Sequence, residues 1–593
     1  MIRTPLRPLA RILSARQNGE NPDVIERENI RQRHEDMRDG ARERSEGRLL
    51  VLGAFFLLAF VTVGVRMSAL ASSDPVEPRS ATTRAAINAQ RGDIVDRNGR
   101  ILATNLVTHS LYAKPPFMVD KAASARELAR IFPDLDAENL LAQFNGERKF
   151  LWIKRRISPE QQQLVHDIGD PGLEFGPREM RLYPNGRLAA HVLGGASFGR
   201  EGVHSAEVIG VAGVEKAFDT YLRDPATGGE PLQLSIDLTV QAAAERVLAG
   251  GMKLMNARGA ASVLMDVQTG EVISLVSLPD FDPNNRPNPL AAGSPSDSPL
   301  FNRAVQGVYE LGSTFKTFAI AQALEQNMLD ANTLIDTSSP LKWGKYNIRN
   351  SHRMDPIMSV TNVMVESSNT GTARIAQQIG AQPQQDFLAG LGLLQATPVE
   401  LVEAPGTKPL LPRKWSEISA MTISYGHGLS VSPMHLAAAY ATIVNGGTKV
   451  SPTLLSTPDV APGQRIVSQE TSASIRSMLR QVVTDGTAKF GNVEGYDVGG
   501  KTGSADKPKA TGGYHEDKVI ATFASFFPAD NPRYVLVVML DEPVETSGTK
   551  PRRSASWTAV PVAAEMIRRT APLLGLRPQI ETGAEDGLTL ISN

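Results

Sequence analysis

Residues 312–317 read Gly-Ser-Thr-Phe-Lys-Thr and open an apolar stretch with helical periodicity. A phosphate-binding loop would need glycines where the chain has Glu310 and Phe315, so that interpretation fails. What remains is Ser-x-x-Lys at the start of a helix. The i, i+3 spacing places Ser313 and Lys316 on one face, where an amine of lowered pKa could take the hydroxyl proton. For this motif alone, an N-cap serine beside an exposed lysine is the competing interpretation.

A second motif, Ser367-Ser368-Asn369, lies between helical patterns at 360–366 and 372–379. It reads as Ser-x-Asn on a loop. The hydroxyl of Ser367 could relay a proton to a leaving amine, and the amide of Asn369 could orient a substrate backbone. An ordinary helix cap between the two helices is the alternative.

The third motif, Gly-Gly-Lys-Thr-Gly-Ser at 499–504, precedes the last pair of predicted strands. Glycines such as Gly503 allow another backbone to approach a strand closely. Lys501 supplies positive charge for a carboxylate, and Thr502 and Ser504 supply hydroxyl donors. A tight turn with a solvated lysine is the alternative.

The segments around these motifs predict an α/β (α+β) domain. Strand patterns come first, helical patterns occupy the middle, and strands with a helix close the domain, which indicates a mainly antiparallel sheet flanked by helices. The predicted strands are 232–236, 260–266, 271–277, 519–526 and 533–540, and the main predicted helices are 238–248, 317–326, 434–444 and 558–569.

Composition excludes several classes of function. The 593 residues are too many for one core, and the net charge of -1 gives no basic excess for nucleic acid. Cysteine is absent, which excludes thiol catalysis, Fe–S clusters and cysteine zinc sites. None of the nine histidines forms His-Glu-x-x-His, so we expect no metal site of that type.

One segment near the N-terminus predicts a membrane anchor. Residues 49–65 are apolar or small, and a helix over 49–71 would span the hydrocarbon core with Arg66 extending outward. A cleaved signal peptide is the rival, but 48 residues precede the run and the run is long. Arginines before the run place the N-terminus in the cytoplasm and residues 72–593 across the membrane.

A mixed, non-catalytic module follows a linker at 72–80. Asn98-Gly99 predicts a hairpin, 122–132 and 159–168 predict helices, and Arg and Asp near the turns predict a structural ion-pair network. The predicted organisation is a cytoplasmic tail at 1–48, a transmembrane helix at 49–71, a pedestal of the dimerisation type at 72–230, a catalytic domain at 231–572 and a C-terminal tail at 573–593.

The three motifs, in this order and context, resemble the active-site set of penicillin-recognising serine acyltransferases. Three further segments resemble class B penicillin-binding proteins: the Arg-Gly run at 91–99, the Tyr-Pro-x-Gly run at 181–186, and Gly-Val-Glu-Lys at 213–216. The short connection between Tyr183 and Gly213 is similar to that of the division-specific septal transpeptidase. The sequence departs from the family pattern at three positions, Leu311, His427 and Ser504.

The resemblance implies a D,D-transpeptidase fold and activity without metal or cofactor. Ser313 would attack the penultimate D-Ala carbonyl of a peptidoglycan stem peptide with Lys316 as base, and an amine of another stem would take the acyl group. Ser367 and Lys501 would assist proton transfer, and Asn369 would position the substrate. Thr502, Gly503 and Ser504 would form the substrate-binding strand. The backbone N–H groups of Ser313 and Ser504 would form the oxyanion hole, and β-lactams would acylate Ser313.

The resemblance also implies partners and a location. Peptidoglycan stem peptides and nascent glycan strands would be substrates, and the septal glycosyltransferase and other division-complex membrane proteins would be partners. The protein would lie in the cytoplasmic (inner) membrane with a periplasmic catalytic domain.

Several alternatives remain open at this point. An elongation-specific transpeptidase and a D,D-carboxypeptidase would share the motifs. A membrane-anchored β-lactamase would need a base that activates water, and Glu403 stands at a suggestive place. A β-lactam sensor would need a signalling domain, which the sequence lacks, and intact motifs disfavour a catalytically inactive scaffold.

Overall fold

The computed structural model divides the chain into two compact units, Met1–Thr83 and Arg84–Asn593. The structure describes residues 7–72, 91–201, 206–456, 463–509 and 511–579. Most of the predicted linker at 72–80 and residues 580–593 of the predicted tail lie outside the described residues. The two units are described separately below.

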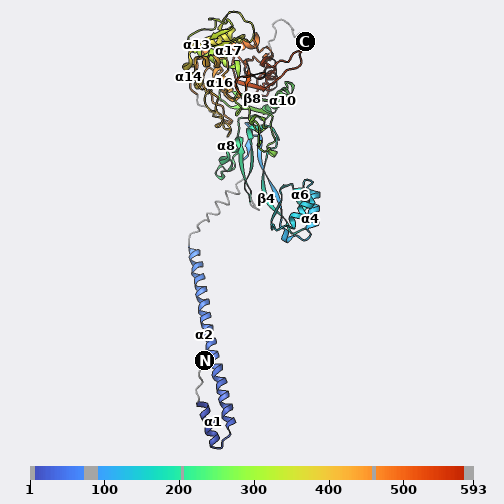
Figure 1. The fold of residues 1–593 in the computed structure, drawn as a ribbon, viewed down its shortest axis with the longest axis vertical. Helices are drawn as coiled ribbons and strands as arrows, with labels where there is room; N and C mark the ends of the chain where they lie inside the picture. The colour runs from blue at the N-terminus through green and yellow to red at the C-terminus, as the bar shows by residue number, and fades with distance from the viewer. Residues whose placement is uncertain (1–6, 73–90, 202–205, 457–462, 510, 580–593) are drawn as a thin grey trace, which may run out of the picture. The chain divides into compact units, whose positions relative to one another are not determined.

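The first unit is helical (Figure 1). A short helix, α1 (Arg7–Gln17), precedes the 51-residue helix α2 (Pro22–Ser72). Within α2, Glu46–Met67 is the one span among the described residues that is long and apolar enough to cross a membrane. Such a span satisfies its backbone polar groups internally, as lipid requires. The predicted helix at 49–71 is therefore present, and the mixed-charge stretch before it is also helical.

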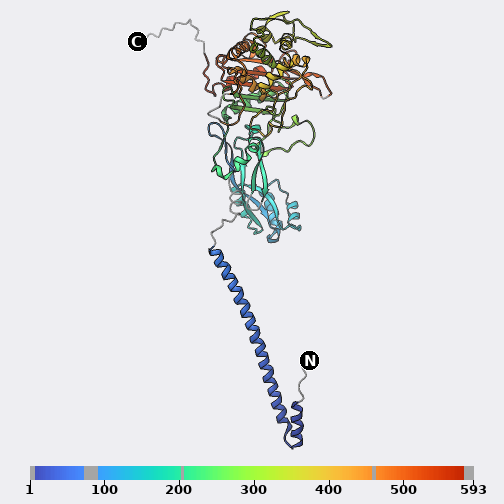
Figure 2. The same ribbon diagram turned by 90° about the vertical axis from the view of Figure 1, so that its left-hand side faces the viewer.

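The second unit begins with a five-stranded sheet in the order β3-β2-β1-β7, with β4 also paired to β2. Its long strands are drawn in blue to green in Figure 2. The predicted Asn98-Gly99 hairpin joins β1 to β2, and Gly99 has a φ of 78°, which glycine adopts without strain. Three helices pack against β2, β3 and β4 and enclose a small hydrophobic core that is separate from the main core. The strands are β1 (Ile94–Val95), β2 (Ile101–Ala113), β3 (Leu151–Ile157), β4 (Leu173–Leu182) and β7 (Leu232–Gln233), and the helices are α4 (Lys121–Ile131), α5 (Ala137–Phe144) and α6 (Pro159–His166).

A buried ion cluster holds this module together, and its central carboxylate belongs to Glu215 and not, as the sequence had indicated, to an aspartate near the turns. The fully buried carboxylate of Glu215, on α8 (Gly213–Ala217), accepts from Arg91 Nε at 2.7 Å and from Arg181 Nε at 2.6 Å. Tyr183 donates to the same carboxylate at 3.2 Å. Removal of one partner from such a cluster would leave an uncompensated buried charge, which costs about 3–5 kcal/mol. The cluster therefore fixes α8 against β4 and the start of β1.

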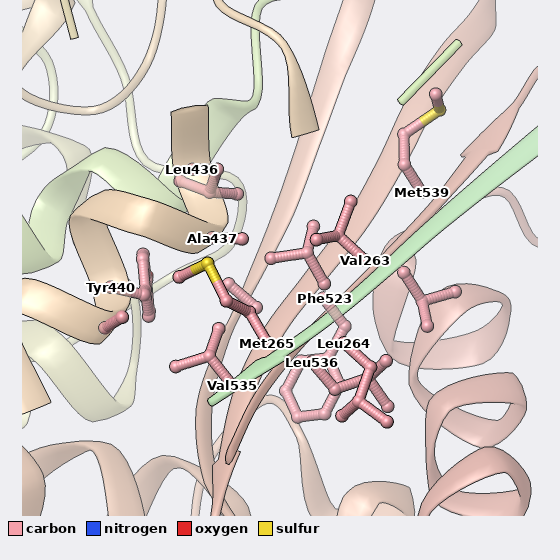
Figure 3. Packing of buried hydrophobic residues seen from close by; sticks show 14 of the residues in the cluster. Val263, Leu264, Met265, Leu436, Ala437, Tyr440, Phe523, Val535, Leu536 and Met539 are labelled. Carbon is pink, nitrogen blue, oxygen red and sulfur yellow. The ribbon is translucent and has the colours of Figure 1, made fainter. Parts of the chain in front are cut away.

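The larger part of the second unit is built on an antiparallel sheet in the order β14-β15-β16-β8-β9. Figure 3 shows how α16 (Pro433–Val444) presents Leu436, Ala437 and Tyr440 to Met265 and Val535. Helices α10 (Leu238–Leu254) and α18 (Ala559–Thr570) also pack on this sheet. Every residue of β9 and β16 is buried, because elements cover both faces. The strands are β8 (Gly259–Asp266), β9 (Val272–Leu278), β14 (Gly499–Pro508), β15 (Tyr514–Phe527) and β16 (Tyr534–Asp541).

The predicted fold class is confirmed, and one predicted strand is shorter than expected. The hairpin at 260–277 is β8–β9, and the late strand pair is β15–β16. The strand predicted over 232–236 ends after Gln233, because the chain turns into the N-cap Asp237 of α10. In addition, β7 pairs in parallel with β1, so it extends the first sheet and not the second.

Candidate active site

Ser313 lies in a single 3-10 turn, Gly312–Phe315, that precedes α11 (Lys316–Glu325). The serine caps no helix, since the N-cap position is Leu311 and no side chain caps the turn. In a 3-10 turn, side chains at i and i+3 eclipse each other. Lys316 Nζ accordingly lies 2.8 Å from Ser313 Oγ, which confirms the contact that the spacing predicted.

Lys316 is fully buried and lies against four oxygen atoms. Besides Ser313 Oγ, its Nζ contacts Ser367 O at 2.7 Å, Ser367 Oγ at 3.0 Å and Asn369 Oδ1 at 2.7 Å. None of the four is a carboxylate. Burial, and secondly the charge of Lys501, hold the pKa of Lys316 well below its usual range. The amine is therefore biased toward its neutral form.

Ser367 stands between α12 (Val360–Val365) and α13 (Asn369–Ile379) with a φ of 64°. A non-glycine residue in this left-handed region is strained by roughly 1–3 kcal/mol, which persists only where the surroundings impose it. The conformation lets both the carbonyl and the hydroxyl of Ser367 reach Lys316. Ser368 caps α13 by accepting from Gly371 N, which fixes Asn369 at the first helical position. The predicted loop is present but shorter than expected, because α13 begins at Asn369 and not at residue 372, so Asn369 lies on the helix.

Lys501 enters the same cluster from β14. Its Nζ donates to Ser367 Oγ at 2.9 Å, so that hydroxyl lies between two buried amines. Burial lowers the pKa of Lys501 to about 7. Thr502 shares a hydrogen bond with the Thr487 hydroxyl at 2.8 Å, and Ser504 Oγ accepts from Ala555 N at 2.9 Å.

β14 is an edge strand, and its glycines permit its position beside Ser313. A Cβ on Gly503 would lie 2.1 Å from the carbonyl oxygen of Leu311. A Cβ on Gly312 would lie 2.9 Å from the backbone nitrogen of Ser504. The 3-10 turn and the strand therefore meet backbone to backbone, as the glycines in the third motif suggested.

The eight predicted site residues come from the 3-10 turn, α11, α13, β14 and the loop before α13, which meet at this point: Ser313, Lys316, Ser367, Asn369, Lys501, Thr502, Gly503 and Ser504. The sequence analysis missed Thr487, Ala555 and the carbonyl of Arg349, which accepts from Asn369 Nδ2 at 3.0 Å. No local pattern marks these three, because each acts through a contact distant in sequence.

The loop at 425–428 includes His427, where the sequence departs from the family pattern. This loop forms hydrogen bonds to the 3-10 turn and to Glu310, which precedes the turn. Gly426 O accepts from Gly312 N at 3.3 Å, and Gly428 N donates to Glu310 Oε1 at 2.9 Å. Burial, and secondly the charge of Lys316, lower the pKa of His427 to about 4. The imidazole is neutral at physiological pH.

Glu403, the base that a β-lactamase interpretation required, is used elsewhere. Its Oε1 accepts from the backbone N–H of Gly213 at 3.0 Å, at the start of α8. This carboxylate has no hydrogen bond to the motif residues, so its described contacts give it a structural role between the two parts of the second unit.

Comparison with known proteins identifies the class that this fold and site define. The penicillin-binding protein transpeptidase domain matches residues 260–560, and the penicillin-binding protein dimerisation domain matches residues 86–229. The chain belongs to the penicillin-binding protein transpeptidases, in the class B form that the sequence predicted.

Two curated sequences and one solved structure show which members of this family the chain is similar to. The probable peptidoglycan D,D-transpeptidase FtsI of Caulobacter vibrioides is 35% identical, with 92% of each chain covered. Peptidoglycan D,D-transpeptidase FtsI of Escherichia coli K12 is 28% identical over 77% of this chain and 80% of its own length. The crystal structure of penicillin-binding protein 3 from Mycobacterium tuberculosis with ampicillin matches at a TM-score of 0.62 and 25% identity, covering 84% of this chain and 97% of that one.

The approach of β14 to the 3-10 turn yields a stability prediction. Gly503→Ala places a methyl group against the Leu311 carbonyl, and we expect a loss of about 1–3 kcal/mol in unfolding free energy. The thermal unfolding midpoint of the full chain in detergent measures it. Gly250→Ala in α10 is the matched control, because nothing lies within 4 Å of its Cβ position. A midpoint that is unchanged in Gly503→Ala would contradict the close approach.

Proposed function

We propose that the protein is a serine D,D-transpeptidase that cross-links peptidoglycan stem peptides at the division septum. One observation carries the proposal: a continuous chain of contacts runs from Ser313 Oγ to Lys316 Nζ at 2.8 Å, to Ser367 Oγ at 3.0 Å and to Lys501 Nζ at 2.9 Å. A nucleophile, a base and a route for the proton are thereby joined without histidine or carboxylate.

Activation of the nucleophile follows from the donors and acceptors around Lys316. Ser367 O and Asn369 Oδ1 can only accept, so they take the two N–H groups of a neutral amine. The lone pair of that amine is then directed to the hydroxyl of Ser313, which donates its proton. Ser313 Oγ attacks the penultimate D-Ala carbonyl and forms a tetrahedral intermediate.

Collapse of the intermediate needs a proton for the leaving D-Ala amine. Ser367 Oγ lies between Lys316 and Lys501, so it can donate its proton to the leaving nitrogen and recover one from a lysine. The C–N bond to D-Ala breaks and the ester to Ser313 remains. An amine of a second stem then takes the place of D-Ala, and the same groups operate in reverse to form the cross-link.

The edge of β14 is suited to hold the donor stem. An unpaired strand edge offers backbone groups to an extended peptide. Thr502, Ser504 and the charge of Lys501 would bind the terminal carboxylate. Gly312 lies against the backbone of Ser504, and the backbone N–H groups of Ser313 and Ser504 would stabilise the oxyanion.

The membrane topology and the partners extend this proposal. Arginines before the apolar span support a cytoplasmic tail at 1–48, an anchor at 49–71 and a catalytic domain across the cytoplasmic membrane. The anchor would keep the pedestal at 72–230 and the catalytic domain at 231–572 beside nascent glycan strands. The septal glycosyltransferase and other division-complex membrane proteins are the proposed partners.

The septal role is supported by the short Tyr183–Gly213 connection and by similarity to two transpeptidases named FtsI. An elongation role is the alternative. Depletion of the protein in its host should produce filaments, because septal cross-links would fail while side-wall growth continues. Cell length by light microscopy is the measurement, and rounded cells would contradict the septal role.

The acyl-enzyme gives the direct test of the chemistry. Full-length protein in detergent, treated with a β-lactam, should gain the mass of one inhibitor and keep it for hours, because a transpeptidase admits water slowly. Ser313→Ala should lose the adduct, whereas the exposed serine in Ser338→Ala should not matter. Intact-mass spectrometry measures both. An adduct that disappears in seconds would favour a β-lactamase, and absence of any adduct in folded protein would contradict the Ser313 assignment.

The two lysines predict a pH dependence for acylation. The reactive form has Lys316 neutral and Lys501 charged. Since burial lowers the pKa of Lys501 to about 7, the rate should fall above about pH 7 as Lys501 loses its charge. The pKa of Lys316 is held well below its usual range, so its neutral form is available below the pH at which an ordinary lysine loses its proton.

The second-order acylation rate between pH 5 and 9 measures this profile, with a β-lactam whose own charge is constant. Burial also raises the pKa of Glu245 to about 7, so Glu245→Gln is the matched control and should retain the falling limb. A rate that still increases at pH 9 would contradict a charged Lys501 in the reactive form.

A further inference from the structure

The stretch from Thr337 to Met354 has an unusual charge for this chain. It contains four Lys or Arg residues and no Asp or Glu, although the whole chain has 62 basic and 63 acidic residues. The four cations are Lys342, Lys345, Arg349 and Arg353. The function proposed above gives no role to their side chains.

Lys342 and Lys345 belong to a hairpin with a fixed orientation, and Arg349 and Arg353 lie in the segment that follows it. β11 (Leu341–Trp343) pairs with β12 (Tyr346–Ile348) across a two-residue turn. Leu341, Trp343 and Ile348 pack into a small core with Ala373 of α13 and Met421. The hairpin is thus tied to the same helix that carries Asn369.

The four cations are all exposed, and none of them forms an ion pair with another of the residues that the structure describes. The neighbouring acidic side chains are mostly engaged elsewhere: Glu366 lies 3.4 Å from His352, and Asp336 pairs with Arg374 at 2.8 Å. Asp355 is the remaining carboxylate beside the stretch. Positive charge on this hairpin is therefore presented to solvent largely uncompensated.

Hydrogen bonds connect the segment after the hairpin directly to the helix that carries Asn369. Asn369 Nδ2 donates to the carbonyl of Arg349 at 3.0 Å. The next residue, Asn350, accepts from Thr370 N at 3.0 Å and donates to Thr337 O at 3.1 Å. A ligand held by the basic hairpin would consequently lie beside the residue that positions the reacting peptide.

We propose that this basic hairpin, residues 341–353, is a docking surface for the carboxylates of peptidoglycan stem peptides on the strand that is being cross-linked. The inference rests on the proposed function, because each uncross-linked stem ends in a carboxylate and a glycan strand that bears many stems is a polyanion. One exposed ion pair contributes only about 0–1 kcal/mol. Several cations within a screening length act together on a polyanion, raise its local concentration and lose this effect in salt.

Co-sedimentation with purified peptidoglycan sacculi tests the proposal on the full-length protein in neutral detergent. The variant Lys342→Glu/Lys345→Glu/Arg353→Glu leaves Arg349 and its carbonyl untouched. We expect its apparent affinity at about 50 mM salt to fall at least about tenfold, and the difference from wild type to shrink to about twofold at roughly 500 mM salt. Sacculi whose carboxylates have been converted to neutral amides should bind wild type as weakly as the variant.

A charge-matched control separates the hairpin from total charge. Lys216→Glu/Arg246→Glu/Lys253→Glu reverses three exposed cations on α8 and α10, which supply none of the eight site residues. It should bind sacculi within about twofold of wild type, and thermal unfolding should confirm that both variants are folded. Equal losses in the two variants, or no loss in the hairpin variant, would overturn the proposal. Failure of the proposed function would appear separately, as absence of a Ser313-dependent β-lactam adduct in wild type.

Discussion

The burial of two lysine amines around one serine hydroxyl is the constraint on which the site depends. Lys316 and Lys501 are fully buried, and both contact Ser367 Oγ, yet no carboxylate lies among their hydrogen-bond partners. Two adjacent ammonium groups in such a place would repel each other and lack solvation. The protein resolves this by lowering both pKa values, which is the property that acid–base chemistry at neutral pH requires.

Supporting elements hold these amines in place. Tyr440 of α16 donates to Thr314 O at 2.9 Å and shares a hydrogen bond with the Thr317 hydroxyl at 2.8 Å. The 3-10 turn is thereby fastened to the helix that covers the large sheet. On the opposite side, β14 approaches at Gly503 without any side chain between. The spacing between Ser313 and Lys501 is consequently set by the sheet and α16 together, since neither motif could fix it alone.

The two parts of the second unit share one continuous core, which includes Ile94 and Leu102 beside the residues of β8 and β16. The Glu215 cluster fixes the position of α8, and Glu403 accepts from the backbone N–H at the first residue of that helix. Glu403, which the sequence analysis considered as a hydrolytic base, thus makes a structural contact at the interface between the two parts of the second unit. A pedestal attached in this way is suited to orient the catalytic part and not merely to tether it.

The sequence by itself predicted the contact between Ser313 and Lys316, the order of the three motifs, the antiparallel sheet and the apolar span. These depend on local spacing and periodicity, as in the i, i+3 pair of Ser313 and Lys316. Only the tertiary structure decided the left-handed φ of Ser367, the partners Thr487 and Ala555, and the contact of Glu403 with Gly213. Each of these features depends on contacts between segments that are distant in sequence, and local propensity carries no information about such tertiary contacts.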